Sequence, residues 1–286
     1  MKKQMLVGCV AMAVMACGLR VGAQESAAAG RKILDSAKNS VIKVKVVVQQ
    51  KMLMNGTEGQ STEETKEVTG TVIDPAGLVV MSLTAVDPSR LMDSIMKRVG
   101  GGMKMETRFQ IKDVKLILTD GTEVEASIVL RDKDLDLAFV RPTQKLAEPL
   151  PTIDLTRQTR PDVLDEVVVV KRLDKVANHE PAAVVSRISA IVRKPRLFYI
   201  PQLADGGMED MGAPVFGMDG NLVGLIVMRI METSGGGGLT SMFGGAGGMG
   251  LTAIVLPAAD ILESAKQAVE AKVEKPAASA PAEKVP

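Results

Sequence analysis

The sequence predicts an all-β fold built from two antiparallel barrels, and three observations support this. Short apolar strands follow one another closely along the chain. Asp120-Gly121 and Asp219-Gly220 each stand between two such strands, and Asp-Gly supplies the positive φ angles that tight hairpins need. A polar, Pro-containing stretch over residues 151–164 divides the strands into two sets. Closely spaced hairpins are typical of barrels, so we expect the two barrels to meet near Leu150–Arg160.

The composition limits the kinds of partner that the protein can bind. Hydrophobic residues make up 46% of the 286-residue chain, which is ample for a core, whereas aromatic residues make up only 2%. The 35 Lys and Arg residues balance 34 Asp and Glu residues, so the formal net charge is +1. A chain without a field of one sign, and with few rings to stack on bases, does not favour nucleic acid or an anionic membrane surface as a partner.

Residues 1–23 have the pattern of a signal peptide. Lys2 and Lys3 precede the apolar run Met5–Cys17, and Val21-Gly22-Ala23 is a small-residue cleavage site. The apolar run is shorter than the ~20 residues that a membrane-spanning helix needs. We therefore expect a cleaved signal and a periplasmic or secreted protein. The alternative is a lipoprotein anchored through Cys17, because the residues before this cysteine loosely resemble a lipidation box.

Residues 24–40 are predicted to form an N-terminal helix and linker. Ser26–Ser40 is the helical part, and Ile33 and Leu34 are its expected apolar contacts. The two cysteines of the chain, Cys9 and Cys17, both lie within the signal segment. The mature chain is thus expected to have no disulfide and no thiol nucleophile.

The first barrel is predicted over residues 41–155. Its strands are runs of alternating or fully apolar residues bounded by turn residues: Val41–Gln50, Val68–Ile73, Leu78–Met81, Val114–Leu118 and Glu123–Val129. Asn55–Lys66 is polar and rich in Gly, Thr and Glu, so we expect a hairpin loop there. Ser89–Val99 has helical spacing and is expected as a helix within a surface insertion over Asp87–Ile111.

The second barrel with a C-terminal helix is predicted over residues 156–272. Its expected strands are Glu166–Arg172, Pro181–Arg193, Phe198–Gln202, Pro214–Phe216, Leu222–Met228 and Gly250–Pro257. The expected helix is Ala258–Lys272, with one apolar face made of Ile261, Leu262, Ala265 and Val269. Residues 273–286 form an Ala-, Pro-, Glu- and Lys-rich tail that composition predicts to be disordered.

Three spaced motifs resemble the trypsin-like serine proteases of the HtrA-like (Deg) type. Val68–Val86 resembles the family's hairpin that leads to the catalytic histidine, and Asp136-Leu137-Ala138 resembles the strand that follows the catalytic aspartate. Glu209-Asp210-Met211-Gly212-Ala213-Pro214 occupies the place of the family's Gly-Asn-Ser-Gly-Gly-Pro loop. The resemblance implies two six-stranded antiparallel β-barrels of the chymotrypsin fold. We expect no PDZ domain after the second barrel, although many HtrA-like proteases carry one.

The resemblance also implies a degenerate triad, that is, a pseudoprotease. The catalytic histidine falls on Thr84, the aspartate on Asp136 and the serine on Met211. A threonine hydroxyl is no general base near neutral pH, and a thioether has no proton to lose before attack on a carbonyl. Asp136 has a structural interpretation as well, since a buried Asp can accept hydrogen bonds from local backbone N–H groups.

The oxyanion loop departs from the family pattern too. The resemblance assigns its two N–H donors to Glu209 and Met211. Two carboxylates, those of Glu209 and Asp210, disfavour an anion that develops nearby. Without the nucleophile and the base, on the order of 10⁶-fold of the rate is lost.

We therefore expect a polypeptide- or partner-binding protein of the cell envelope, with no cofactor and no metal. Met208, Gly212 and Met231 are candidate cleft residues. The flexible thioethers of the two methionines suit apolar binding, although such methionines also fill gaps in cores. The alternative is an active serine endopeptidase with a rewired site, in which the sole histidine, His179, is the first candidate base. An oligomer is possible on either interpretation.

Overall fold

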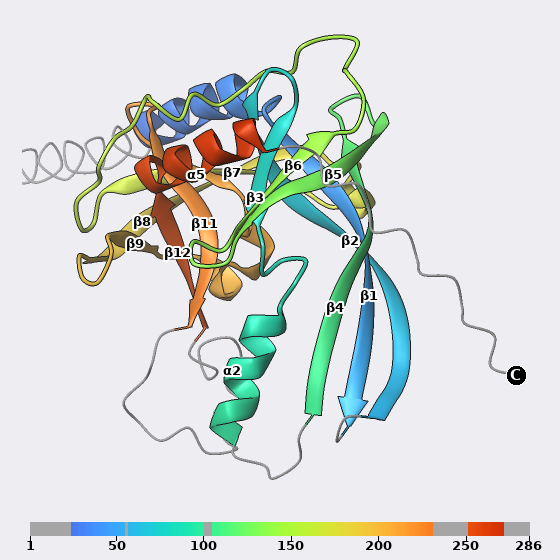
Figure 1. Cartoon of the computed structure of the whole chain (residues 1–286). Helices are drawn as coiled ribbons and strands as arrows, with labels where there is room; N and C mark the ends of the chain where they lie inside the picture. Colours follow the sequence, from blue (N-terminus) through green and yellow to red (C-terminus); the bar gives the residue numbers. More distant parts are fainter. Residues whose placement is uncertain (1–23, 55–56, 100–104, 231–250, 272–286) are drawn as a thin grey trace, which may run out of the picture.

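The computed structural model describes residues 24–54, 57–99, 105–230 and 251–271, and it consists of two closed, six-stranded antiparallel barrels (Figure 1). The strand order is β1-β2-β3-β6-β5-β4 in the first barrel and β10-β11-β12-β9-β8-β7 in the second. The predicted fold class is confirmed. The predictions for the signal segment 1–23, for Met231 and for the tail 273–286 lie outside the described residues.

The first barrel carries one helix between its third and fourth strands. Its elements are β1 (Val41–Met54), β2 (Thr57–Asp74), β3 (Leu78–Ser82), α2 (Ser89–Val99), β4 (Met105–Ile117), β5 (Glu123–Asp132) and β6 (Leu137–Pro142). The predicted turn at Asp120-Gly121 is present, with Gly121 at φ 83°. Helix α2 has the bounds that its helical spacing predicts.

The second barrel begins after the connecting segment. Its elements are β7 (Glu166–Arg172), η1 (Lys175–Ala177), β8 (Pro181–Val192), β9 (Phe198–Pro201), η2 (Ala204–Asp210), β10 (Pro214–Gly217), β11 (Leu222–Ile230), β12 (Leu251–Pro257) and α5 (Ala258–Glu270). The predicted turn at Asp219-Gly220 is also present, with Gly220 at φ 79°. No helix of the described residues is long and apolar enough to cross a membrane.

Three hydrophobic cores hold this arrangement together. One lies inside the first barrel around Val44 and Met81, and one inside the second around Val169 and Ile226. The third lies between the barrels and contains fully buried side chains of both, such as Phe139 and Leu225. Burial of such side chains contributes about 1.5–3 kcal/mol each, so the two barrels stabilise each other as well as themselves.

The polar stretch Asn55–Lys66 was predicted to be a hairpin loop. The hairpin is present, since β1 and β2 pair antiparallel, but Thr57–Lys66 is part of strand β2 and not a loop. Strand β2 begins at Thr57 and pairs with β1 in one continuous register from Ser61 to Thr71. On its other side, β1 pairs with β4, which begins at Met105, inside the expected insertion. Figure 1 shows β1, β2 and β4 projecting together beyond the barrel. Residues 61–65 are exposed, so the strand needs no apolar residues there, and polarity alone misled the prediction.

Two helices cover the core between the barrels. The first runs over residues 24–37, and Ile33 is buried in it as predicted. In α5, Ile261 and Ala265 are buried, but Val269 is 53% exposed and Ala268 takes its expected place in the core. Arg141 of β6 donates to the Ala268 carbonyl at 3.0 Å, so α5 is attached to the first barrel as well as to the second.

Candidate functional site

The three positions assigned to the triad come from loops at the edges of both barrels. Thr84 follows the end of β3, and Asp136 directly precedes β6. Met211 follows η2 in the second barrel. Asp136 has a positive φ of 61°, a conformation that Asp tolerates better than most residues. This turn directs the carboxylate toward Ser82 and Thr84 rather than into the barrel wall.

The Asp136 carboxylate accepts four hydrogen bonds. Its Oδ1 accepts from the Thr84 N–H and from Thr84 Oγ1, both at 2.7 Å. Its Oδ2 accepts from Ser82 Oγ at 2.7 Å and from the Met228 N–H at 3.1 Å. Burial raises the pKa of the Asp136 carboxyl, and the hydrogen bonds from Ser82, Thr84 and Met228 oppose that rise. The donors come from both barrels, so this carboxylate joins them.

Met211 contacts the same cluster through Ser82. The Ser82 hydroxyl lies 3.8 Å from Met211 Sδ, and Met211 packs against the core of the second barrel. The structure thus brings Thr84, Asp136 and Met211 together, with Ser82 between the last two. Their assignment to triad roles stays a prediction. Sequence reasoning missed Ser82, because nothing in its local pattern predicts that it faces Asp136.

Gly212 fixes the loop that carries Met211. It has φ +85°, and a Cβ at this position would overlap the Thr69 carbonyl oxygen. Its N–H donates to the Ile226 carbonyl at 2.8 Å, and its carbonyl accepts from Thr71 Oγ1 at 3.0 Å. The predicted cleft residue Gly212 is therefore a packing position between the barrels, where only glycine fits.

The residues before Met211 are part of the 3₁₀ helix η2. Glu209 lies inside this helix, and Asp210 ends it. Asp210 is 9% exposed and forms an ion pair with Lys171 Nζ at 2.5 Å. Met208, predicted as a cleft residue, is 44% exposed. Glu209 thus lies in a helical turn, and its assignment as an oxyanion donor stays a prediction.

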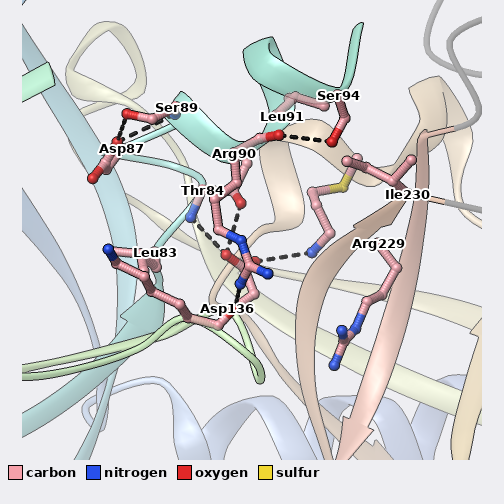
Figure 2. A pocket seen from close by; sticks show the side chains of 12 residues that line it. Leu83, Thr84, Asp87, Ser89, Arg90, Leu91, Ser94, Asp136, Arg229 and Ile230 are labelled. Atoms are coloured by element: carbon pink, nitrogen blue, oxygen red, sulfur yellow. Dashed lines mark hydrogen bonds between the residues drawn. The ribbon is translucent and has the colours of Figure 1, made fainter. Parts of the chain in front are cut away.

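A pocket of about 300 Å³ opens beside Asp136, between the loop after β3, helix α2 and strand β11 (Figure 2). Its lining combines apolar side chains with several charged ones: Leu83, Thr84, Asp87, Ser89, Arg90, Leu91, Ser94, Lys133, Asp136, Met228, Arg229 and Ile230. The pocket thus lies where the two barrels meet, next to the Asp136 carboxylate.

Comparison with known families agrees with this geometry. A family model described as a trypsin-like peptidase domain matches residues 68–225, more than half of the chain. The chain belongs to the trypsin-like peptidase domain family. A search of curated proteins finds no match.

The sole histidine of this trypsin-like chain contacts a different place. His179 Nε2 lies 2.8 Å from Glu67 Oε2 on β2, and its carbonyl accepts a hydrogen bond from Arg172 at 2.8 Å. Its ring is not among the partners of Asp136. A base at the trypsin-like site would therefore have to come from another residue type. Among the described residues, no group of three His, Cys, Asp or Glu side chains could hold a metal ion.

Proposed function

We propose that this protein is an exported, HtrA-like member of its family that binds an extended polypeptide and does not hydrolyse it. The observation that carries the proposal is the set of hydrogen bonds to the Asp136 carboxylate, whose four donors are two hydroxyls and two backbone N–H groups. None of these groups is a base near neutral pH. An aspartate that orients an imidazole in an active enzyme is here used to hold the barrel edges in place.

The nucleophile position supports the same conclusion. Met211 has a thioether, which cannot form an acyl-enzyme. The neighbouring hydroxyl, Ser82 Oγ, is fully buried and donates a hydrogen bond to the Asp136 carboxylate. Its other close neighbour is Met211 Sδ, at 3.8 Å. A buried hydroxyl without a base is not an activated nucleophile.

Binding is supported by the edge that β11 presents near Met228 and Ile230, where no strand of the described residues pairs on that side. The Ile226 N–H and carbonyl both pair toward the Gly212–Ala213 segment. Because strand residues alternate with period two, the backbone groups of Met228 and Ile230 face the same side. In the described residues β12 alone pairs with β11 at these positions, from its opposite side, and the Met228 N–H donates to Asp136. The Met228 carbonyl and both Ile230 backbone groups are positioned for strand addition.

Localisation in the periplasm, or secretion, belongs to the same proposal. The signal pattern of residues 1–23 supports it. A partner would then be a polypeptide of the cell envelope, and fractionation of expressing cells with detection of the mature chain tests it. Recovery of the uncleaved chain in the cytoplasm would contradict export, without bearing on binding.

Inactivity is tested with the purified protein, a fluorophosphonate probe and casein. We expect no labelling and no turnover, and we expect Thr84→His and Met211→Ser to stay inactive as single changes, since triad members act as a unit. Casein turnover that Asp136→Ala abolishes would contradict the proposal. Loss of that turnover in His179→Ala would assign the activity to a rewired site.

Strand addition is tested at Ile230, with labelled peptides and fluorescence anisotropy. Ile230→Pro removes the outward N–H but no bond to β12, so we expect about 3- to 10-fold weaker binding, the effect of one hydrogen bond. Ile230→Ala is the matched control, because it trims the side chain and keeps the N–H. Equal affinities of the two variants would argue against strand addition.

A further inference from the structure

Arg229 is a partly buried cation without a carboxylate partner in the described part of the chain. It lies on β11 between Met228 and Ile230, the two residues whose backbone groups are positioned for strand addition. Its NH2 group donates to the Asp134 backbone carbonyl at 2.6 Å. None of the ion pairs found among the described residues includes it. A guanidinium has five N–H donors, so most of its hydrogen-bonding capacity is left for another group.

The charges near Arg229 are of both signs, and among the described residues no carboxylate forms an ion pair with it. Burial lowers the pKa of Arg229, and the positive charges of Arg196 and Arg90 lower it further, while Asp136 and Asp134 raise it. Arginine nevertheless stays protonated in proteins. Arg229 and Arg90 both line the pocket, and two protonated guanidinium groups in one pocket are a favourable place for an anion.

Arg90 supplies a second cation to the same pocket. It projects from the first turn of α2, and Figure 2 shows its side chain reaching down from the helix. Its NH1 group donates to the Lys133 carbonyl, and it lies 3.7 Å from Asp134 Oδ1. Both side chains of this pair are well exposed, 61% and 89%, so the pair contributes little. Arg90 is available to a ligand at small cost.

The carboxylates of the pocket, by contrast, already have donors. Asp136 accepts four hydrogen bonds. Asp87 Oδ1 accepts from the N–H and the hydroxyl of Ser89. The acidic side chains that line the pocket are thus paired with neutral donors, whereas the two arginines have no strong carboxylate partner among the described residues.

We infer that the pocket between α2 and β11 takes an acidic side chain, Glu or Asp, of a polypeptide that lies along β11. The inference rests on the proposed function and names the chemistry of its partner. The cavity of about 300 Å³ has room for one such side chain beside the strand. A carboxylate there meets Arg229 from β11 and Arg90 from α2, and planar guanidinium groups bind carboxylates through paired hydrogen bonds.

The test compares fluorescein-labelled, N-acetylated and C-amidated peptides that differ only at a central Glu, Gln or Lys. We expect the wild-type protein to bind the Glu peptide roughly 10-fold or more tightly than the Gln peptide at low salt, and the Lys peptide most weakly. The preference should shrink as NaCl is raised. Arg229→Gln should bring the Glu and Gln affinities to within about 2-fold, and Arg90→Gln should reduce the preference by a smaller factor.

Two further variants sharpen the test. Arg187→Gln removes a guanidinium from β8 that pairs with Glu166 and does not line the pocket, so it should keep the full preference. Asp134→Asn removes the competing carboxylate near Arg90 and should increase the preference for Glu. Arg90 is well exposed, so Arg90→Gln keeps the test decisive even if Arg229→Gln folds poorly.

Each remaining outcome has one meaning. Equal wild-type affinity for the Glu and Gln peptides overturns the acidic pocket and leaves the proposed function standing. A Gln peptide with a free C-terminal carboxylate that binds more tightly than the amidated Glu peptide overturns the assignment to a side chain. No binding of any peptide overturns both the inference and the proposed function.

Discussion

The two barrels contact each other through a buried carboxylate at one place and through charged pairs at another. The Asp136 cluster consists of Ser82, Thr84 and Asp136 from the first barrel, with Met211 and Met228 from the second, and its donors are all neutral. The His179 cluster joins Glu67 to His179 at 2.8 Å and Lys43 to Asp174 at 2.8 Å, while Arg172 donates to the carbonyls of Lys38, Val41 and His179.

The difference lies in how each cluster satisfies its buried groups. At Asp136 a single carboxylate receives four short donors, so its geometry is fixed and loss of the carboxylate leaves several donors without acceptors. At His179 each pair is partly accessible, and the Asp174 side chain is 75% exposed. Water and salt can replace such partners. Disruption of the Asp136 cluster is therefore expected to cost more stability than disruption of the His179 cluster.

The largest effect is expected from Gly212→Ala, next to the Asp136 cluster. The added Cβ would overlap the Thr69 carbonyl oxygen, and the backbone has φ +85°. We expect a loss of about 3 kcal/mol or more in the free energy of unfolding, measured by urea denaturation. Gly220→Ala, also at positive φ but with open space around it, is the matched control and should lose only about 1 kcal/mol. Equal losses would show that packing against Thr69 is unimportant.

The next effect is expected from Asp136 itself. Asp136→Ala leaves Ser82 Oγ, Thr84 Oγ1 and two backbone N–H groups without their acceptor, and we expect a loss of about 2–4 kcal/mol. Asp136→Asn keeps one acceptor and tolerates the positive φ, so about 1–2 kcal/mol is expected. Urea denaturation of both variants measures the difference. A loss of under about 0.5 kcal/mol in the alanine variant would mean that the carboxylate does not join the barrels.

Lower pH should widen the difference in the free energy of unfolding between the wild type and Asp136→Asn. Burial raises the pKa of the Asp136 carboxyl, so the folded chain binds this proton at a higher pH than the unfolded chain does. The resulting stabilisation is complete below the ordinary Asp range and is lost as pH rises through the folded pKa. Relative to the Asn variant, the wild type should therefore gain stability as the pH falls from about 7 to about 4.5. A relative loss over that range would contradict the sign.

The smallest effect is expected in the His179 cluster. Glu67→Gln should lower the free energy of unfolding by about 0.5–1 kcal/mol at low ionic strength, because the His179 contact is partly accessible. The loss should fall toward zero in about 1 M NaCl, whereas that of Asp136→Asn should not change. Denaturation at both salt concentrations checks this. A loss that persists in high salt would place the His179 cluster in the same class as the Asp136 cluster.

Local patterns in the sequence predicted most of the strands and both Asp-Gly turns. The turns at Asp120-Gly121 and Asp219-Gly220 are present because a hairpin depends on adjacent residues alone. The chain has one histidine, His179, but only the structure shows that its ring contacts Glu67 rather than Asp136. The loop predicted from polarity at residues 57–66 is wrong, because a strand projects beyond the barrel there and the side chains of residues 61–65 are exposed.

Only the tertiary structure decided what surrounds Thr84, Asp136 and Met211. The groups that meet there come from segments that are distant in sequence. They are Ser82, the Met228 N–H, and Arg90 and Arg229, which line the same pocket. Their contacts depend on how the two barrels close and meet, and no periodicity or spacing along the chain encodes that. The sequence determined which chemical groups are present and which are missing, whereas the packing of one barrel on the other determined that Asp136 is fully bonded and that two cations face the same pocket.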